Sequence, residues 1–285
     1  MELASDGYRL VVAPERGGSI LAFDWRGQPL LRASSGAGIL DVASFPLVPF
    51  SNRIADGRFT WGERNLALEP NFPEVDPRNL IHGFGWLSEW QMLNSGEREL
   101  HLEHLYSAGE WPWSYGAELV YALDEEGLSA RLSLTNLSDK PMPAGLGFHP
   151  YFPQTGSTRY LGLHWGEWRS DASAMPIELD LRESPTDWWH GAAVATRAVD
   201  TVYTGREGGL EILWPERDLA LRISLSDNLS ATCVYVPQNL GWFCVEPVSH
   251  MTDAINRPDA PDQMASLPPG ETMVVEMRLQ AFALA

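Results

Sequence analysis

Short runs in which large apolar residues alternate with small or polar ones are the feature of this chain that most restricts its fold. The clearest runs are 130–135, 219–226 and 273–280, and similar runs at 8–13 and 19–25 begin the chain. A period of two gives a strand one face toward the core and one toward solvent. Glycine and proline turns separate the runs, and no segment shows sustained helical spacing with caps. The sequence therefore predicts an all-β protein, either an antiparallel sandwich or a barrel.

Turn-forming residues are spread along the whole chain. The 25 glycines and 21 prolines are not gathered into a linker, and no internal repeat is evident. We therefore expect a single domain over residues 1–285. Two regions, 69–79 and 165–190, are irregular and together are rich in Pro, Asp and Trp. Long loops of this kind in a compact domain often carry function.

The charge of the chain limits its partners. A formal net charge of −18 argues against nucleic acid and anionic membranes, because their phosphates need basic surfaces. The expected partner is a small or neutral molecule. Lys140 is the only lysine, so Schiff-base catalysis is not expected and cationic recognition falls to arginine.

No feature of the sequence requires an oxidising compartment. Cys233 and Cys244 lie in apolar, strand-like runs without C-x-x-C spacing, so we expect free buried thiols instead of a disulfide or a metal pair. The first residues lack the basic and apolar regions of a signal peptide, and no apolar run approaches the roughly 18 residues of a membrane helix. We therefore expect a cytoplasmic protein.

The stretch 145–152 places His149 between glycines and a proline followed by two aromatic residues. Glycine allows the backbone to approach a ligand closely, and the proline biases His149 toward an extended conformation. Taken alone, a histidine before a proline at a strand end is more typical of a hydrogen-bonded structural residue than of a site. Its interpretation therefore depends on the other ionisable groups.

Three of those groups also lie beside glycine or proline. Arg53 suits either a ligand with carboxylate, phosphate or hydroxyl oxygens, or a surface ion pair. His82 is a second histidine among glycines and aromatic residues. Glu246 ends an apolar run and precedes a proline, which predicts burial and a raised carboxyl pKa. A general base that works near neutrality needs such a pKa.

Other chemistries have less support. His82, His149 and Glu246 are metal-ligand types, but no short metal-binding spacing accompanies them, so we expect no metal. No G-x-S-x-G motif indicates a nucleophilic serine, and no glycine loop opens a helix as in nucleotide sites. The remaining polar groups and many aromatic rings suit a sugar, whose C–H face packs on rings. The alternative is that most of the 12 tryptophans fill the core.

Five motifs occur in an order that resembles the aldose 1-epimerase (galactose mutarotase) family over nearly the whole chain. They are F-S-N-R-I-x-x-G-x-F at 50–59, I-H-G-x-G-W at 81–86, G-F-H-P-Y-F at 147–152, V-D-T-V-Y at 199–203, and V-E-P with D-A-I-N within 245–256. The resemblance implies a large antiparallel β-sandwich, which agrees with the strand pattern. It also implies interconversion of the α and β anomers of an aldose, with no cofactor.

The resemblance implies roles for individual residues. Glu246 would be the general base, His149 the general acid, and His82 a second acid or a group that orients the substrate. A reference pKa of about 6.5 would let His149 work in either direction near neutrality. Arg53 and Asp200 would bind sugar hydroxyls, and Asp200 rests on the weakest motif. Further candidate sugar contacts are Asn52, Trp113 and Tyr151.

Departures from the family pattern leave the substrate open. Pro153 and Gln154 follow the H-P-Y-F motif, where the family often continues into Asn-Leu. One alternative is a hexose-6-phosphate mutarotase, with Arg58 and Arg78 as candidate phosphate ligands. Another is a non-catalytic carbohydrate-binding protein on the same fold. An enzyme that cleaves sugar polymers would need paired carboxylates, and only Glu246 is convincing. The acidity of the chain favours an unphosphorylated aldose.

Overall fold

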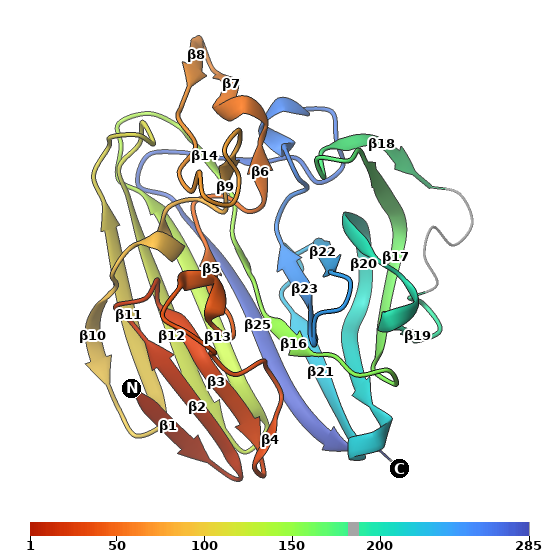
Figure 1. Cartoon of the computed structure of the whole chain (residues 1–285). Helices are drawn as coiled ribbons and strands as arrows, with labels where there is room; N and C mark the ends of the chain where they lie inside the picture. The colour runs from red at the N-terminus through yellow and green to blue at the C-terminus, as the bar shows by residue number, and fades with distance from the viewer. Residues whose placement is uncertain (182–187, 285) are drawn as a thin grey trace.

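The computed structural model describes residues 1–181 and 188–284, and these residues form an all-β sandwich of antiparallel sheets (Figure 1). A four-stranded sheet comes first along the chain and is ordered as in the sequence. Its strands are β1 (Glu2–Ser5), β2 (Tyr8–Ala13), β3 (Ser19–Trp25) and β4 (Gln28–Pro29).

A 15-stranded sheet makes up most of the molecule. From one edge its first strands are β10 (Gln91–Ser95), β11 (Glu99–Tyr106), β12 (Tyr115–Asp124), β13 (Gly127–Asn136), β25 (Thr272–Ala283) and β21 (Leu219–Leu225). It continues with β20 (Val199–Trp214), β22 (Ala231–Val236), β23 (Trp242–Val248), β15 (Gly147–Phe148) and β5 (Pro46–Leu47). Four strands branch from this path: β16 (Tyr151–Pro153) on β23, β17 (Arg159–Ser170) on β20, and β18 (Pro176–Asp180) and β19 (Ala192–Ala193) on β17.

Short elements complete the fold. Three two-stranded sheets pair β6 (Arg53–Ile54) with β9 (Leu80–Ile81), β7 (Arg58–Trp61) with β8 (Arg64–Ala67), and β14 (Met142–Ala144) with β24 (Ala265–Leu267). The described helices are single 3-10 turns: η1 (Ile39–Asp41), η2 (Ala55–Gly57), η3 (Gly85–Leu87), η4 (Val194–Thr196), η5 (Pro215–Arg217) and η6 (Ala254–Asn256). Within the described part of the chain, no helix is long and apolar enough to cross a bilayer.

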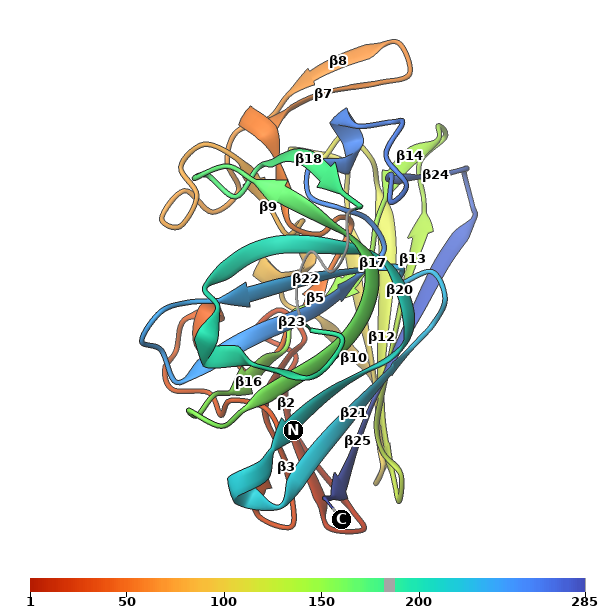
Figure 2. The same ribbon diagram turned by 90° about the vertical axis from the view of Figure 1, so that its right-hand side faces the viewer.

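Two layers create the core. The four-stranded sheet packs on the face of β12, β13 and β25, while β17 and β20 curve around β22 and β23 (Figures 1 and 2). Buried tyrosines tie the layers together: Tyr8 donates a hydrogen bond to the carbonyl oxygen of Ala281 at 3.3 Å, and Tyr121 donates to that of Gly18 at 2.9 Å. β22 and β23 lie inside the fold, where most of their side chains are buried.

The predicted strands are largely confirmed. β2, β3 and β21 match the alternating runs, β25 is the predicted closing strand, and Cys233 and Cys244 are free, buried thiols. Region 69–79 contains no strand, as expected. The prediction of irregular structure over 165–190 is wrong for β17 and β18, and 182–187 lie outside the described residues. The inward positions of β17 include Gly162, His164 and Gly166, which hide its period of two.

Candidate active site

Glu246 lies in β23, an interior strand that pairs with β22 on one side and with β15 and β16 on the other. Apolar residues precede it, and the glutamate is 3% exposed. Burial raises the pKa of its carboxyl well above the usual range, because the charged form loses its hydration; the charge of Asp200 adds to this shift and that of Arg53 opposes it. The predicted burial and raised pKa are therefore confirmed.

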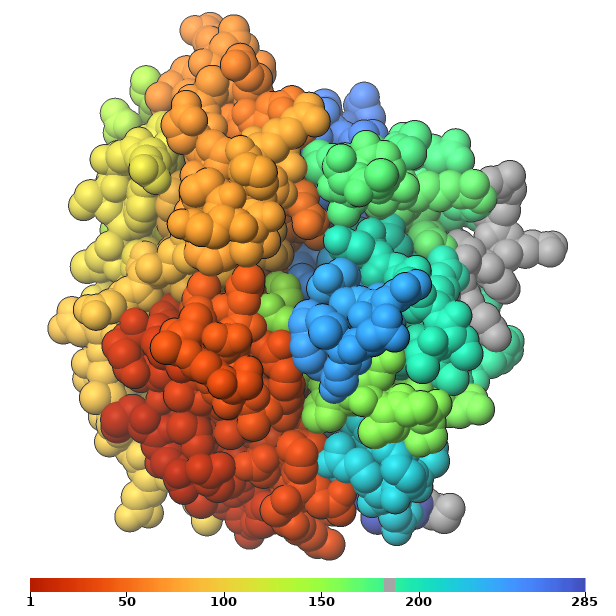
Figure 3. All heavy atoms as spheres, in the orientation of Figure 1, coloured from red at the N-terminus to blue at the C-terminus, as the bar shows by residue number. Residues whose placement is uncertain are grey.

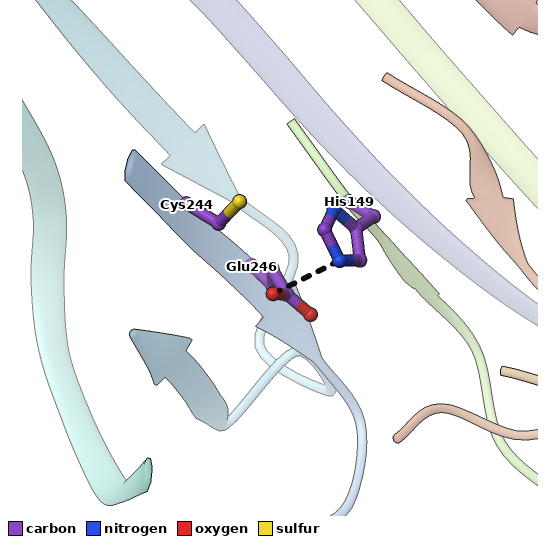
Figure 4. A group of neighbouring side chains, drawn as sticks. All are labelled: His149, Cys244 and Glu246. Atoms are coloured by element: carbon purple, nitrogen blue, oxygen red, sulfur yellow. Dashed lines mark ion pairs between the residues drawn. The ribbon is translucent and has the colours of Figure 1, made fainter. Parts of the chain in front are cut away.

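His149 lies between β15 and β16 and faces Glu246 (Figure 4). Its Nε2 atom is 3.2 Å from Glu246 Oε1. Phe45 stacks on the imidazole with ring centroids 4.4 Å apart, and its carbonyl oxygen accepts a hydrogen bond from the His149 backbone N–H at 2.9 Å. Gly147 allows β15 to approach β23, since a Cβ there would lie 2.8 Å from the carbonyl oxygen of Pro247.

The protonation state of His149 differs from the expectation. Burial lowers the pKa of His149 to about 3, and the nearby positive charge of Arg32 lowers it further, against an opposing backbone hydrogen bond. The expectation that this imidazole titrates near 6.5 is therefore wrong. Burial moves the pKa of Glu246 in the opposite direction, so a protonated carboxyl beside a neutral imidazole is favoured over the ion pair.

His82 and Asn52 are joined by two hydrogen bonds next to the short β6–β9 sheet. The His82 N–H donates to the carbonyl oxygen of Asn52 at 2.9 Å, and the Asn52 N–H donates to His82 Nδ1 at 3.2 Å. Both residues have positive φ, 59° and 54°, a conformation that is uncommon outside glycine. Burial lowers the pKa of His82 well below its usual value, and the charges of His149 and Arg53 add to the shift.

Arg53 provides the cation of the site. Its Nε donates to Asp76 Oδ2 at 3.0 Å, and its Nη1 lies 3.8 Å from Asp200 Oδ2. Its backbone N–H donates to Asn52 Oδ1 at 2.8 Å. Burial raises the pKa of Asp200, and the charge of Arg53 opposes this shift. Asp76 comes from the irregular region 69–79, so that region helps to orient the guanidinium.

Three aromatic side chains form a wall beside His149, whose ring centroid lies 4.7 Å from that of Tyr151. The rings of Tyr151 and Trp242 have centroids 5.0 Å apart, and those of Tyr235 and Trp242 are 5.9 Å apart. The Arg32 guanidinium lies 3.9 Å from the Tyr151 ring centroid and 4.8 Å from that of Trp242. Its Nη2 also donates to two backbone carbonyl oxygens at 2.6 and 2.7 Å. Arg32 therefore braces this wall through cation–π contacts.

One cavity of about 250 Å³ lies between Glu246, His149, Arg53 and the aromatic wall. Figure 3 shows a recess on this face between the red and orange N-terminal segments and the blue and green C-terminal ones. The predicted site residues that line the cavity are Asn52, Arg53, His82, His149, Tyr151, Asp200 and Glu246. The remaining lining residues are Leu40, Val75, Ile81, Trp86, Cys233, Tyr235 and Trp242.

Three residues considered for substrate binding lie elsewhere. Trp113 is 2% exposed and packs on Trp111 and Phe59, with ring centroids 5.2 and 6.5 Å away. Trp113 therefore does not line the cavity, in contrast to the expectation that it contacts the sugar, because its ring is buried in the aromatic core. Arg58 and Arg78 are exposed and do not line the cavity.

A larger surface hollow occurs elsewhere among the described residues. It measures about 430 Å³ and runs along Gln154, Arg197 and Asn239, but it contains neither Glu246 nor His149. Size alone supplies no chemistry, whereas a buried pair with shifted pKa values in a concave site does. We therefore assign the candidate active site to the smaller cavity.

The family model for aldose 1-epimerase matches residues 1–280. The chain belongs to the aldose 1-epimerase family. Its relatives include the uncharacterised Escherichia coli K12 protein YphB, which is 32% identical over 286 residues, covering 93% of each chain. The aldose 1-epimerase of Escherichia coli K12 is 26% identical over 179 residues, covering 54% of this chain and 51% of that protein.

The architecture agrees with this membership. A crystal structure of a galactose mutarotase-like protein from Clostridium acetobutylicum matches with a TM-score of 0.88 at 20% identity, covering 99% of this chain and 95% of that one. The galactose-mutarotase-like sandwich implied by the sequence motifs is therefore confirmed.

Two cavity residues, Trp242 and Tyr235, were not predicted from the sequence, although the strand pattern contains a signal for each. Trp242 lies four residues before Glu246 on β23, and even spacing puts both side chains on one face. Tyr235 stands opposite Cys244 in the β22–β23 ladder, next to the pair Cys233 and Glu246, and so shares that face. No comparable signal marks Arg32, whose contact with the wall depends on the tertiary fold.

Proposed function

We propose that this protein interconverts the α and β anomers of an unphosphorylated aldose. The observation that carries the proposal is the buried Glu246–His149 pair, whose Oε1 and Nε2 atoms are 3.2 Å apart in the cavity. The two sugar oxygens that exchange protons in mutarotation, the C1 hydroxyl and the ring oxygen, are bonded to the same carbon. One pair this compact can therefore serve both oxygens.

Ring opening removes one proton from the sugar and adds another. Proton transfer within the pair first gives a Glu246 carboxylate and a His149 imidazolium. Glu246 takes the proton of the C1 hydroxyl while His149 donates one to the ring oxygen, so the bond from C1 to the ring oxygen breaks and the aldehyde forms. Rotation about C1–C2 and reclosure with the roles reversed give the other anomer. Both protons return, and no redox partner is needed.

The rest of the cavity suits a monosaccharide. A volume of about 250 Å³ lies at the small end of ligand pockets. Hydroxyl groups need donors and acceptors, and a sugar's C–H face packs on aromatic rings. We assign the first role to Asn52, Arg53, His82 and Asp200, and the second to Tyr151, Tyr235 and Trp242.

The charges of the site favour a neutral sugar over a sugar phosphate. Arg53 is already paired with Asp76 and faces Asp200, so little of its charge is left for a dianion. Arg58 and Arg78, the candidate phosphate ligands, do not line the cavity. A phosphate there would also approach the carboxyl groups of the site.

Anomer exchange provides the direct test. Catalytic amounts of protein are added to freshly dissolved α-D-glucose, α-D-galactose and their 6-phosphates, and the anomers are followed by NMR. We expect the protein to accelerate anomer exchange of at least one free sugar, and to accelerate exchange of the 6-phosphates less. Faster exchange of a 6-phosphate would instead support a hexose-6-phosphate mutarotase.

Anomer exchange combined with a binding measurement distinguishes the enzyme from a non-catalytic carbohydrate-binding protein. Saturable sugar binding by calorimetry without acceleration of anomer exchange would support that function and remove the enzymatic one. A cytoplasmic location forms part of the enzymatic proposal and is tested by cell fractionation of the native protein.

A further inference from the structure

A third side chain meets the proton-handling pair. Cys244 lies two residues before Glu246 on β23, so its sulfur points to the same side as the carboxyl group (Figure 4). One atom each of His149, Cys244 and Glu246 lie within 4.8 Å of one another, and all three residues are buried. We propose that this group binds a soft divalent cation such as Zn²⁺, in competition with the sugar.

One carboxyl oxygen of this group has no partner. Within the described part of the chain, the buried Glu246 Oε2 neither accepts nor donates a hydrogen bond. Buried polar atoms are normally satisfied, so unpaired ones at a ligand-type cluster point to an additional ligand. A cation coordinated by the group would engage the carboxyl and imidazole that sugar hydroxyls would otherwise meet.

The spacing suits tetrahedral coordination. Bonds of about 2.0–2.1 Å from zinc to nitrogen and oxygen put those two ligand atoms about 3.3 Å apart at a tetrahedral angle. His149 Nε2 and Glu246 Oε1 are 3.2 Å apart. With a zinc–sulfur bond of about 2.3 Å, the sulfur belongs about 3.6 Å from either atom. One ligand atom of each of the three residues lies within 4.8 Å of the others, so coordination would require the Cys244 sulfur to move toward the pair.

The charges of the ligands also match. A thiolate, a carboxylate and a neutral imidazole sum to two negative charges, which balance a divalent cation. Balance matters here because an uncompensated charge in a buried site is costly. The thiolate selects zinc and its neighbours over magnesium or calcium, which prefer oxygen ligands. The cavity leaves a fourth coordination position for water or a sugar hydroxyl.

Cobalt substitution tests the site without any activity measurement. The purified protein is titrated with Co²⁺, and we expect one equivalent to produce a thiolate-to-cobalt charge-transfer band that Zn²⁺ displaces and Mg²⁺ does not. Cys244→Ser should lose the band and bind Zn²⁺ more weakly by more than the 10- to 100-fold typical of outer-shell changes. Cys244→Ala is the second variant, and circular dichroism verifies that each one folds.

Cys233→Ser is the matched control. Cys233 is the other free, buried thiol of the described residues, and its sulfur accepts a hydrogen bond from Asn52 Nδ2 at 3.4 Å. The control should keep the cobalt band. A band that survives in Cys244→Ser, or wild-type protein that binds no Zn²⁺ at all, would overturn the proposal. Because these readouts do not depend on anomer exchange, they separate the cation site from the proposed catalysis.

Discussion

The rings of His82 and His149 meet edge to face, with centroids 5.1 Å apart and planes at 90°. Because His82 Nδ1 accepts the Asn52 N–H, the neutral His82 ring carries its proton on Nε2. Its pKa is held well below the usual value by burial and by the neighbouring charges. A ring that stays neutral can donate a hydrogen bond but is a poor source of protons. We therefore propose that His82 orients the sugar.

Replacement of His82 by Asn tests this role. Asn tolerates the positive φ at this position better than most residues, so the backbone should be preserved. Loss of one hydrogen bond to the sugar should raise KM by roughly 2- to 10-fold, since such a bond contributes about 0.5–1.5 kcal/mol. Anomer-exchange kinetics separate the two constants. A fall in kcat of about 100-fold at constant KM would instead identify His82 as an acid.

Replacement of Glu246 by Gln removes the proposed base and keeps the shape of the side chain. We expect kcat to fall by roughly 10²–10⁴-fold, the usual contribution of a positioned base, while calorimetry still detects sugar binding. The matched control is Cys233→Ser, which alters the same wall without changing an ionisable carboxyl. Full exchange activity in Glu246→Gln would contradict the assignment of the base.

The pH dependence of kcat/KM should have no inflection at the usual histidine value. His149 has its pKa lowered to about 3, so the second proton of the pair is added only in strong acid. The pKa of Glu246 is raised, so the single proton is lost only as the pH rises through that raised value. We therefore expect no acid limb near pH 6.5 and a decline only as the pH rises through the raised Glu246 value. An acid limb centred near pH 6.5 would show that the imidazole titrates normally.

The sequence predicted the fold and much of the site because their signals are local. Period-two runs mark β2, β3, β21 and β25, and short motifs bring out Glu246, His149 and His82. Whether a given side chain lies in the core or in the cavity could not be predicted from local sequence. Trp113 and Trp242 are both aromatic and both follow turn-rich segments, yet packing buries one ring in the core and puts the other in the cavity.

This difference between the two tryptophans predicts different mutant phenotypes. Trp113→Phe should lower the free energy of unfolding by on the order of 1 kcal/mol with little change in KM, because its ring packs on Trp111 and Phe59. Trp242→Phe should raise KM for the sugar, because its ring lines the cavity and contacts Tyr151. Thermal unfolding and anomer-exchange kinetics on both variants test the assignment. A raised KM in Trp113→Phe but not in Trp242→Phe would contradict the placement of the two rings.

His104 provides a test of acid stability away from the catalytic pair. It is buried beside Trp90 and Tyr115, and burial lowers its pKa to about 4. The unfolded chain, with a histidine pKa of about 6.5, therefore binds a proton more readily than the folded one. Its contribution to stability is complete above pH 6.5 and is lost as the pH falls toward 4, by about 1.4 kcal/mol per pH unit and about 3 kcal/mol in all.

His104→Gln should remove this pH dependence while keeping a polar group near the Tyr115 hydroxyl, which lies 3.3 Å from His104 Nε2. We expect the difference in unfolding free energy between wild type and variant to change in favour of the variant as the pH is lowered from 7 to 4. Other buried histidines and carboxyl groups titrate in both proteins, so their contributions cancel in this difference. Urea unfolding at several pH values measures it. A difference that does not vary with pH would mean that His104 protonates equally well in the folded protein.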